Sequence, residues 1–196
     1  ARGNDIAVDV NGNVYVTGWK KAGTPTKEDF TTVKYNSSGV EQWTVKYGGA
    51  ERDIANYFWA SNNRIVYVQD SKGDENFRLF AVDKNGKNQK DLTPFEKVRV
   101  QIIDDLDNND NEMVIGLNKR NPTVFDVYKI DINTGKMNMV QENPGNVTGW
   151  MTDHNGKLRI AYVMDGVETS LLYRNSEKDK FKNVITTSFK ETLAPL

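Results

Sequence analysis

The densest group of side chains that could bind an ion is the segment DDLDNNDNE at 104–112. Calcium is held by several carboxylate, amide and carbonyl oxygens of this kind. The candidate calcium ligands are Asp105, Asp107, Asn109, Asp110 and Glu112. The segment lacks the central Gly of an EF-hand loop, and Asp and Asn are also the residues that turns prefer. A solvated hairpin turn is therefore the favoured interpretation, with calcium binding as the alternative and no other cofactor expected.

A second group of carboxylates occurs in DSKGDEN at 70–76, where Asp70, Asp74 and Glu75 surround a Gly. Short acidic side chains in turns commonly accept hydrogen bonds from nearby backbone N–H groups. We expect a turn in which these carboxylates accept backbone N–H groups and pair with Arg, rather than a binding site.

Nucleophilic catalysis has little support in the residues. The chain has one His and no Cys, and no Gly-x-Ser-x-Gly motif occurs in it. His154 stands in the sequence DHNG, which is typical of a turn. A Ser-His-Asp or Cys-His arrangement needs a base beside the nucleophile, so the sequence predicts no catalytic residues and no enzymatic activity.

The four tryptophans allow two interpretations. An aromatic cage or carbohydrate platform is one, and packing of large apolar area between sheets is the other. Each of the four falls within or at the end of a predicted strand, which favours packing. They are Trp19, Trp43, Trp59 and Trp150.

Composition excludes some partners. Lys and Arg total 26 against 27 Asp and Glu, a net charge of -1. This balance lacks the basic field that nucleic acid binding requires. The sequence contains neither a long apolar run nor the apolar stretch of a signal peptide. We therefore expect a soluble chain that binds neither nucleic acid nor membrane, while its ligand and its compartment stay open.

The elements that position these residues form a repeat. Short runs rich in Val, Ile, Tyr, Phe and Thr alternate with turn-forming Asn, Gly, Asp and Ser. Four units of four strands align, and their first strands begin at 5, 56, 100 and 147. The predicted strands are 5–9, 13–19, 29–36 and 41–48; 56–61, 64–70, 77–83 and 88–94; 100–105, 112–118, 125–132 and 136–142; and 147–153, 158–165, 169–175 and 181–189.

The third strands of the repeat are apolar on both faces. Phe77 and Leu79 alternate with Phe80 and Val82. Such a sheet needs a neighbour on each side, which radial stacking supplies and a two-layer sandwich supplies on one side only. The sequence thus predicts an all-β chain, a β-propeller of four four-stranded antiparallel blades, with a sandwich as the alternative.

We expect a single propeller module over 1–196. The predicted blades cover about 1–50, 51–97, 98–144 and 145–190, and 191–196 would be the remnant of a next blade.

Two resemblances accompany this pattern. Residues 1–50, with IAVDVNGNVYVTGW and DFTTVKYNSSGVEQWTVKYGG, resemble the bacterial seven-bladed β-propeller repeat. Residues 56–196, with YVQDSKGDENFRLFAVD, KDLTPFEKVRVQIID and VIGLNKRNPTVFDVYKIDINTGK, resemble the N-terminal propeller of prolyl oligopeptidase family serine peptidases, of the dipeptidyl aminopeptidase and acylaminoacyl peptidase type. The resemblance changes across GGAERDIA, which indicates a chimera made by natural recombination or by engineering.

The peptidase resemblance implies a propeller that covers and gates a separate hydrolase domain, and this chain has no segment that matches such a domain. We therefore expect a non-catalytic scaffold or interaction module, a recombined or engineered fragment without the catalytic domain. A substrate-gating fragment of a serine peptidase and a calcium-dependent binding module are the alternatives.

The resemblance also bears on ring closure, since propellers of this family have seven or eight blades. Four blades of that shape form a partial ring and would expose two apolar faces. A homodimer that completes an eight-bladed ring is the expected solution. A closed four-bladed propeller is the alternative.

Overall fold

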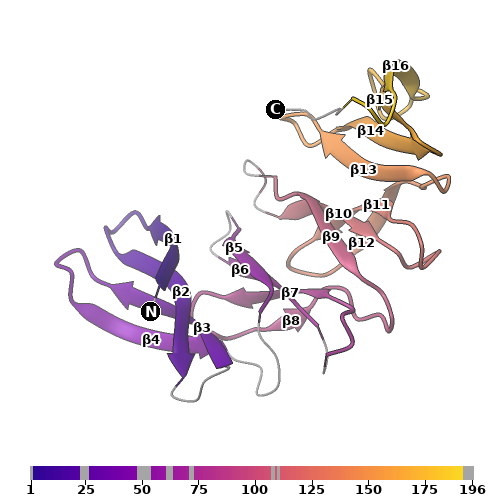
Figure 1. The fold of residues 1–196 in the computed structure, drawn as a ribbon. Coiled ribbons are helices and arrows are strands. Elements are labelled where there is room, and N and C mark those ends of the chain that lie inside the picture. The colour runs from indigo at the N-terminus through magenta and orange to yellow at the C-terminus, as the bar shows by residue number, and fades with distance from the viewer. Residues whose placement is uncertain are drawn as a thin grey trace. The chain divides into compact units, whose positions relative to one another are not determined.

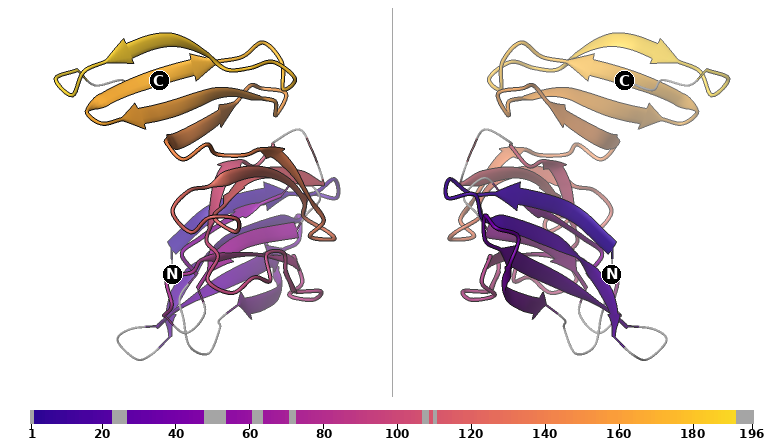
Figure 2. Two further views of the ribbon diagram at one scale, coloured as in Figure 1. Left: turned by 90° about the vertical axis from the view of Figure 1, so that its right-hand side faces the viewer. Right: turned by 90° about the vertical axis from the view of Figure 1, so that its left-hand side faces the viewer.

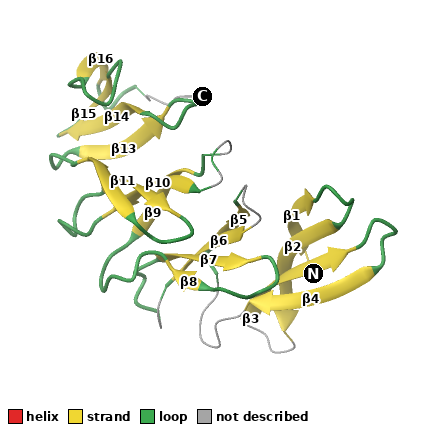
Figure 3. Cartoon of the chain, turned by 180° about the vertical axis from the view of Figure 1, so that it is seen from behind, coloured by secondary structure: helices red, strands yellow, loops and turns green. Residues whose placement is uncertain are grey.

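The computed structural model describes residues 2–22, 27–47, 54–60, 64–70, 73–106, 109 and 111–191. These residues form sixteen strands (Figure 1). The strands are β1 (Arg2–Val8), β2 (Val14–Ala22), β3 (Lys27–Tyr35), β4 (Glu41–Tyr47), β5 (Asn56–Trp59), β6 (Arg64–Gln69), β7 (Arg78–Asp83), β8 (Lys90–Asp91), β9 (Val100–Asp104), β10 (Glu112–Leu117), β11 (Asp126–Asp131), β12 (Met137–Gln141), β13 (Val147–Thr152), β14 (Leu158–Asp165), β15 (Glu168–Tyr173) and β16 (Lys182–Thr187). The described part of the chain contains no helix (Figure 3), hence none of the length and apolarity that a membrane span requires.

The strands form four antiparallel sheets, each with its strands in sequence order. We refer to them as the first sheet (β1–β4), the second (β5–β8), the third (β9–β12) and the fourth (β13–β16). The four strands of the fourth sheet lie side by side in Figure 2. The chain divides into two compact units, residues 1–97 with the first two sheets and residues 98–196 with the last two.

Hairpin turns join the neighbouring strands, as the Gly-containing turn sequences predict. In the turns between first and second strands and between third and fourth strands, Gly recurs at positive φ, a conformation that costs Gly little and other residues more. The glycines are Gly12, Gly39, Gly86, Gly135 and Gly156, with φ between 67° and 80°.

Within each unit the two sheets pack face to face. The first strands β1 and β5 are neighbours in one unit, and β9 and β13 are neighbours in the other. In residues 1–97, Ile65, Tyr67 and Val82 form a buried cluster. In residues 98–196, Val114 and Val127 of the third sheet are buried together with Leu158 of the fourth. In residues 98–196, buried apolar side chains of the two sheets thus supply the contact between them.

One predicted strand is much shorter in the structure. The expected strand over 88–94 is reduced to β8, Lys90–Asp91. The reason lies in Thr93, whose hydroxyl accepts the backbone N–H of Leu79 at 2.8 Å. Asp91 in turn accepts the N–H of Thr93 at 3.0 Å. Side chains therefore replace part of the backbone ladder.

Some predicted features lie outside the described residues. They include residues 48–53 of the segment where the resemblance changes, residues 192–196 of the predicted blade remnant, the calcium candidates Asp107 and Asp110, and the side chain of Trp19.

Candidate functional site

A cleft of about 1180 Å³ lies in residues 98–196, where the β9–β10 connection meets the β13–β14 turn. Most of its lining side chains are polar. The ionisable ones are Asp104, Glu112, Lys129, Asp153, His154, Lys157, Arg159 and Tyr173. The cleft carries acidic, basic and amide side chains. Which of them could bind a ligand depends on the hydrogen bonds that they already make within the protein.

Asp153 organises the β13–β14 turn at the cleft. Its carboxylate accepts the backbone N–H groups of Asn155 at 2.9 Å and Lys157 at 3.0 Å. The guanidinium of Arg159 donates Nε–H to the same carboxylate at 2.7 Å. Burial opposes ionisation of Asp153, but the backbone of Lys157, the Arg159 guanidinium and the backbone of Asn155 together hold its pKa below the ordinary value. The carboxylate thus stabilises the turn in its ionised form.

Asp104, at the end of β9, is engaged in the same way. It accepts the backbone N–H of Leu106 at 2.9 Å, and the hydroxyl of Thr152 donates to its other oxygen. This bond joins the third sheet to the fourth at the edge of the cleft. The hydroxyl proton of Thr152 is therefore used in a hydrogen bond that holds the two sheets together.

The floor of the cleft depends on a close contact between Leu106 and Gly156. A Cβ at Gly156 would lie 2.4 Å from Cδ2 of Leu106, and Gly156 has φ of 67°. Leu106 itself has φ of 52°, the left-handed region that non-Gly residues seldom adopt. The absence of a Cβ at Gly156 leaves the space that Cδ2 of Leu106 occupies, where the loop and the turn meet.

The described calcium candidates do not converge on a common point. Asn109 accepts the N–H groups of Asn111 at 3.0 Å and Glu112 at 3.2 Å, and donates to the Glu112 carboxylate at 3.2 Å. Asp105 is exposed. Among the described residues, no three His, Cys, Asp or Glu side chains are grouped so that they could hold a metal. The bonds of Asn109 are those of a hairpin turn, and calcium binding stays a prediction.

His154 lies in the β13–β14 turn and is exposed at the cleft. The hydroxyl nearest to it in sequence, on Thr152, donates to Asp104 rather than to the imidazole. A base must accept the nucleophile's proton to activate it. As described, the cleft is suited to hydrogen bonding with a polar ligand, without an assembled nucleophile and base.

At 70 and 73–76, two of the acidic side chains accept backbone N–H groups, as expected, and their pairing with Arg stays a prediction. Asp70 accepts the N–H of Glu75 at 3.3 Å, and Asp74 accepts that of Asn76 at 3.0 Å. The nearby Arg78 pairs with Asp91 at 2.9 Å. These contacts fix a turn beside the second sheet.

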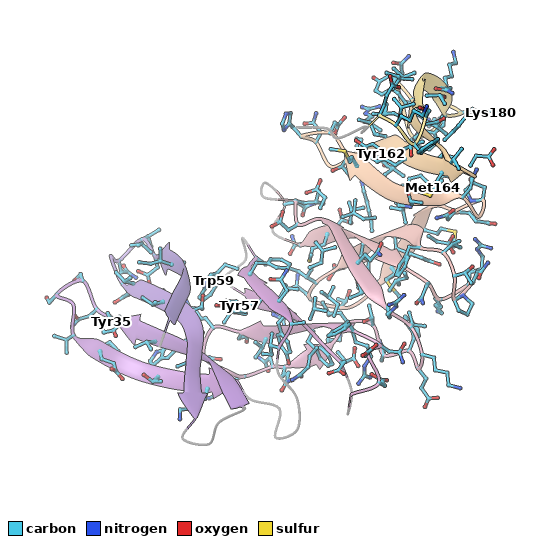
Figure 4. All side chains as sticks on the ribbon, in the orientation of Figure 1. Tyr35, Tyr57, Trp59, Tyr162, Met164 and Lys180 are labelled. Atoms are coloured by element: carbon cyan, nitrogen blue, oxygen red, sulfur yellow. The ribbon has the colours of Figure 1, made fainter. Side chains whose placement is uncertain are left out.

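The described tryptophans take part in contacts between sheets and within them. The rings of Trp43 and Trp59 lie 6.0 and 6.1 Å from that of Tyr15, which joins the first sheet to the second. Trp150 of the fourth sheet donates its indole N–H to the carbonyl of Phe125 at 3.1 Å. Figure 4 labels Trp59 beside Tyr57 on β5.

Sequence reasoning missed a buried ionic network. Asp126 is fully buried and accepts two hydrogen bonds of 2.9 Å from Arg120. The backbone N–H of Asn143 donates to the same carboxylate at 2.8 Å, and the Arg120 guanidinium donates to the Asn143 carbonyl at 2.9 Å. The network fixes the connection from the third sheet to the fourth. An Asp inside the apolar run at 125–132 was the available signal, because a buried carboxylate requires a cation.

Comparison with known proteins places the fold. A family model described as "Beta-propeller repeat" matches residues 2–19. Among solved structures, the β-propeller domain of the Trilobed protease from Pyrococcus furiosus superposes on 93% of this chain and 57% of its own, with a TM-score of 0.54 and 9% identity. The all-β propeller architecture with four four-stranded antiparallel blades is thereby confirmed.

Two curated relatives are peptidases. Dipeptidyl aminopeptidase BIII of Pseudoxanthomonas mexicana is 33% identical over 111 residues, which is 56% of this chain and 16% of that protein. Dipeptidyl peptidase family member 6 of Caenorhabditis elegans is 30% identical over 105 residues, 47% of this chain and 14% of that protein. The chain thus spans about a sixth or less of the length of these relatives, and it is a β-propeller fragment related to the propeller domains of peptidases.

Proposed function

We propose that the chain is a non-catalytic β-propeller module that acts by binding and performs no peptide hydrolysis of its own. The observation that carries this proposal is the engagement of the reactive groups in the cleft. Asp153 and Asp104 accept hydrogen bonds from their own turns, and Thr152 donates to Asp104. Carboxylates held in this way stabilise structure and are poorly placed to act as bases.

The histidine content of the chain supports the same proposal. His154 is the single His in the sequence, and Cys is absent. Activation of a Ser or Thr hydroxyl by an imidazole would require this residue to face the hydroxyl at hydrogen-bond distance. His154 instead belongs to an exposed turn, and the neighbouring Thr152 has a different acceptor.

The relatives support a peptidase origin for the module. The match of residues 2–19 to a propeller repeat, beside the match of 111 residues to dipeptidyl aminopeptidase BIII, favours a recombined or engineered scaffold. In this interpretation the chain supplies a propeller of peptidase origin that serves as a binding module.

Catalysis is tested by assaying the purified chain on aminoacyl- and dipeptidyl-4-nitroanilides. We expect the same background release of nitroaniline from the wild type and from His154→Ala. Release that a serine-directed inhibitor abolishes, and that His154→Ala also removes, would overturn the proposal. Because His154 is the single His, activity that persists unchanged in the variant comes from a contaminating peptidase.

A substrate-gating fragment is the second candidate function, and the 33% identity to dipeptidyl aminopeptidase BIII favours it. The test joins this chain to the hydrolase domain of that peptidase in place of its own propeller. Gating predicts that the fusion cleaves short peptides and discriminates against long ones more strongly than the hydrolase domain alone. Equal discrimination by the two proteins would reject gating.

A further inference from the structure

The first sheet has an apolar side that faces away from the second sheet. Tyr15 of β2 points toward the second sheet, where its ring meets Trp59. Alternation along the strands places the neighbours of Tyr15 on the opposite side. In register on that side lie Ile6, Val16 and Val33, and beside them Val8, Val14 and Tyr35. We call these six residues the leading face; Ile6 and Val8 are 64% and 65% exposed.

The fourth sheet has a corresponding apolar side that faces away from the third sheet. Trp150 and its cross-strand neighbour Ala161 point toward the third sheet. The opposite side carries Met151, Ile160, Tyr162, Met164, Leu171, Tyr173 and Ile185. Met151, Ile160 and Tyr173 also line the cleft. We call the other four residues, Tyr162, Met164, Leu171 and Ile185, the trailing face. Tyr162 and Met164 are labelled on β14 in Figure 4.

The trailing face is one continuous surface. The hydroxyl of Tyr162 donates to the sulfur of Met151 at 3.4 Å, which places both on the same side. Gly149 leaves room for the Tyr162 ring, since a Cβ at this position would lie 3.4 Å from Cδ2 of that ring. Met164 is 53% exposed and Ile185 46% exposed. Large contiguous apolar patches of this kind are unusual on monomers and mark interaction surfaces.

The two faces correspond to the two sides that pack together between neighbouring sheets within each unit. All four sheets run through their strands in the same order, so the two sides of a sheet are not equivalent. In residues 1–97 the Tyr15 side of the first sheet meets Trp59 of the second, and in residues 98–196 the Trp150 side of the fourth sheet meets the third. The trailing face of the fourth sheet corresponds to the side of the first sheet that meets the second. The leading face of the first sheet corresponds to the side of the fourth sheet that meets the third.

We propose that the trailing face of one copy of this chain binds the leading face of a second copy, and that the same contact recurs across a two-fold axis. One chain superposes on 57% of the Pyrococcus furiosus propeller domain, so one copy is shorter than that propeller domain and two copies together are somewhat longer. In such a pair, the trailing face of each copy meets the leading face of the other.

The size of the faces fits a stable dimer. With strands about 4.8 Å apart and a rise of about 3.3 Å per residue, a four-stranded face covers roughly 400 Å². Two contacts use four such faces, or roughly 1,600 Å² in total, which is the size of a standard specific interface. The inference goes beyond the proposed function, because assembly and hydrolysis are separate properties measured separately.

The test is size-exclusion chromatography with light scattering on the 196-residue chain and two charged variants. We expect a wild-type mass of roughly 44 kDa, twice the 22.2 kDa of one chain. The trailing variant, Met164→Lys with Ile185→Lys, and the leading variant, Ile6→Glu with Val8→Glu, are each expected to be monomers because they bury unpaired charge. Circular dichroism establishes that both variants keep their strand content.

A mixture of the trailing and leading variants separates loss of the contact from loss of folding. In a mixed pair, one contact joins the lysines to the glutamates and the other contact is wild type. The mixture should therefore regain the dimer mass while each variant alone does not.

Matched controls are Val40→Lys and Val167→Lys, at 55% and 66% exposed positions in turns of the first and fourth sheets. We expect both controls to remain dimers. A wild-type monomer would overturn the proposal in favour of closure within one chain or faces that stay open. A dimer that survives both charged variants would overturn it in favour of another surface.

Discussion

The same turn occurs in both units, in the first sheet at Asp9–Tyr15 and in the fourth at Asp153–Arg159. Each begins with an Asp that accepts the backbone N–H groups two and four residues later. Each Asp also accepts a hydrogen bond from the side chain six residues later, Tyr15 in one turn and Arg159 in the other. The local chemistry of the two turns is therefore alike.

Their surroundings differ. A Cβ at Gly12 would lie 3.2 Å from Cβ of Ser37, in the next turn of its own sheet. At Gly156 it would lie 2.4 Å from Cδ2 of Leu106, which belongs to the neighbouring sheet and lines the cleft. A turn built by its own residues thus becomes part of a cleft through its packing against another sheet.

The largest expected effect comes from replacing the two glycines. Gly12→Ala places a Cβ at positive φ and is expected to cost about 1–2 kcal/mol of unfolding free energy. Gly156→Ala meets the same strain and also the Leu106 side chain, so we expect a further loss of about 1–3 kcal/mol. Urea unfolding of both variants measures the difference.

The control is the double variant Gly156→Ala with Leu106→Ala. If the contact with Leu106 is the cause, Gly156→Ala costs less in the Leu106→Ala background and approaches the effect of Gly12→Ala. An equal cost for the two glycine variants in the wild-type background would break the comparison.

A smaller effect is expected from removing the two carboxylates. Asn36 shows that an amide keeps the backbone bonds of such a turn, since it accepts the N–H groups of Ser38 and Val40 at 3.0 and 2.9 Å. Asp153→Asn should therefore cost about 1 kcal/mol, the upper end for ion pairs near the surface, because the pair with Arg159 is half-buried. In Asp9→Asn the Tyr15 hydroxyl can still donate a weaker hydrogen bond to the amide oxygen, so the loss of unfolding free energy should be smaller than in Asp153→Asn.

The pH dependence gives the sign of these effects. Hydrogen bonds from the Asn13 side chain and other groups of the turn hold the pKa of Asp9 far below its ordinary value of 3.8, and the pKa of Asp153 is also lowered. Stabilisation by both carboxylates is thus present above about pH 4 and lost as the pH falls further. Each Asp→Asn variant should lose less stability than the wild type between about pH 5 and pH 2. Parallel acid curves for wild type and variants would contradict this account.

The smallest expected effect is that of calcium. Of the candidate ligands, Asn109 and Glu112 line the same cleft as the Asp153 turn. Because Asn109 is engaged with Glu112, we expect the melting temperature to be the same with calcium and with a chelator. A rise in melting temperature with calcium, abolished in Glu112→Gln, would instead identify a calcium site in the second unit.

The turns and the cleft differ in how far the sequence predicts them. The Asp-x-Asn-Gly pattern at Asp9 and Asp153 predicts both turns, because their bonds are made within a few residues. The cleft could not be predicted, since it depends on Leu106 at positive φ and on its contact with Gly156, fifty residues later. Likewise the short β8 depends on a side-chain bond from Thr93 to a neighbouring strand, which no local pattern encodes.

The open faces of the first and fourth sheets carry the central claim, that this chain is one part of a larger propeller. An experimentally determined structure of the 196-residue chain in solution, by electron cryomicroscopy or by crystallography with a matching solution mass, tests it most directly. The account predicts two copies related by a two-fold axis, with Tyr162 and Met164 of each covered by Ile6 and Val8 of the other. Four blades closed within one chain, or a monomer with both faces in solvent, would contradict it.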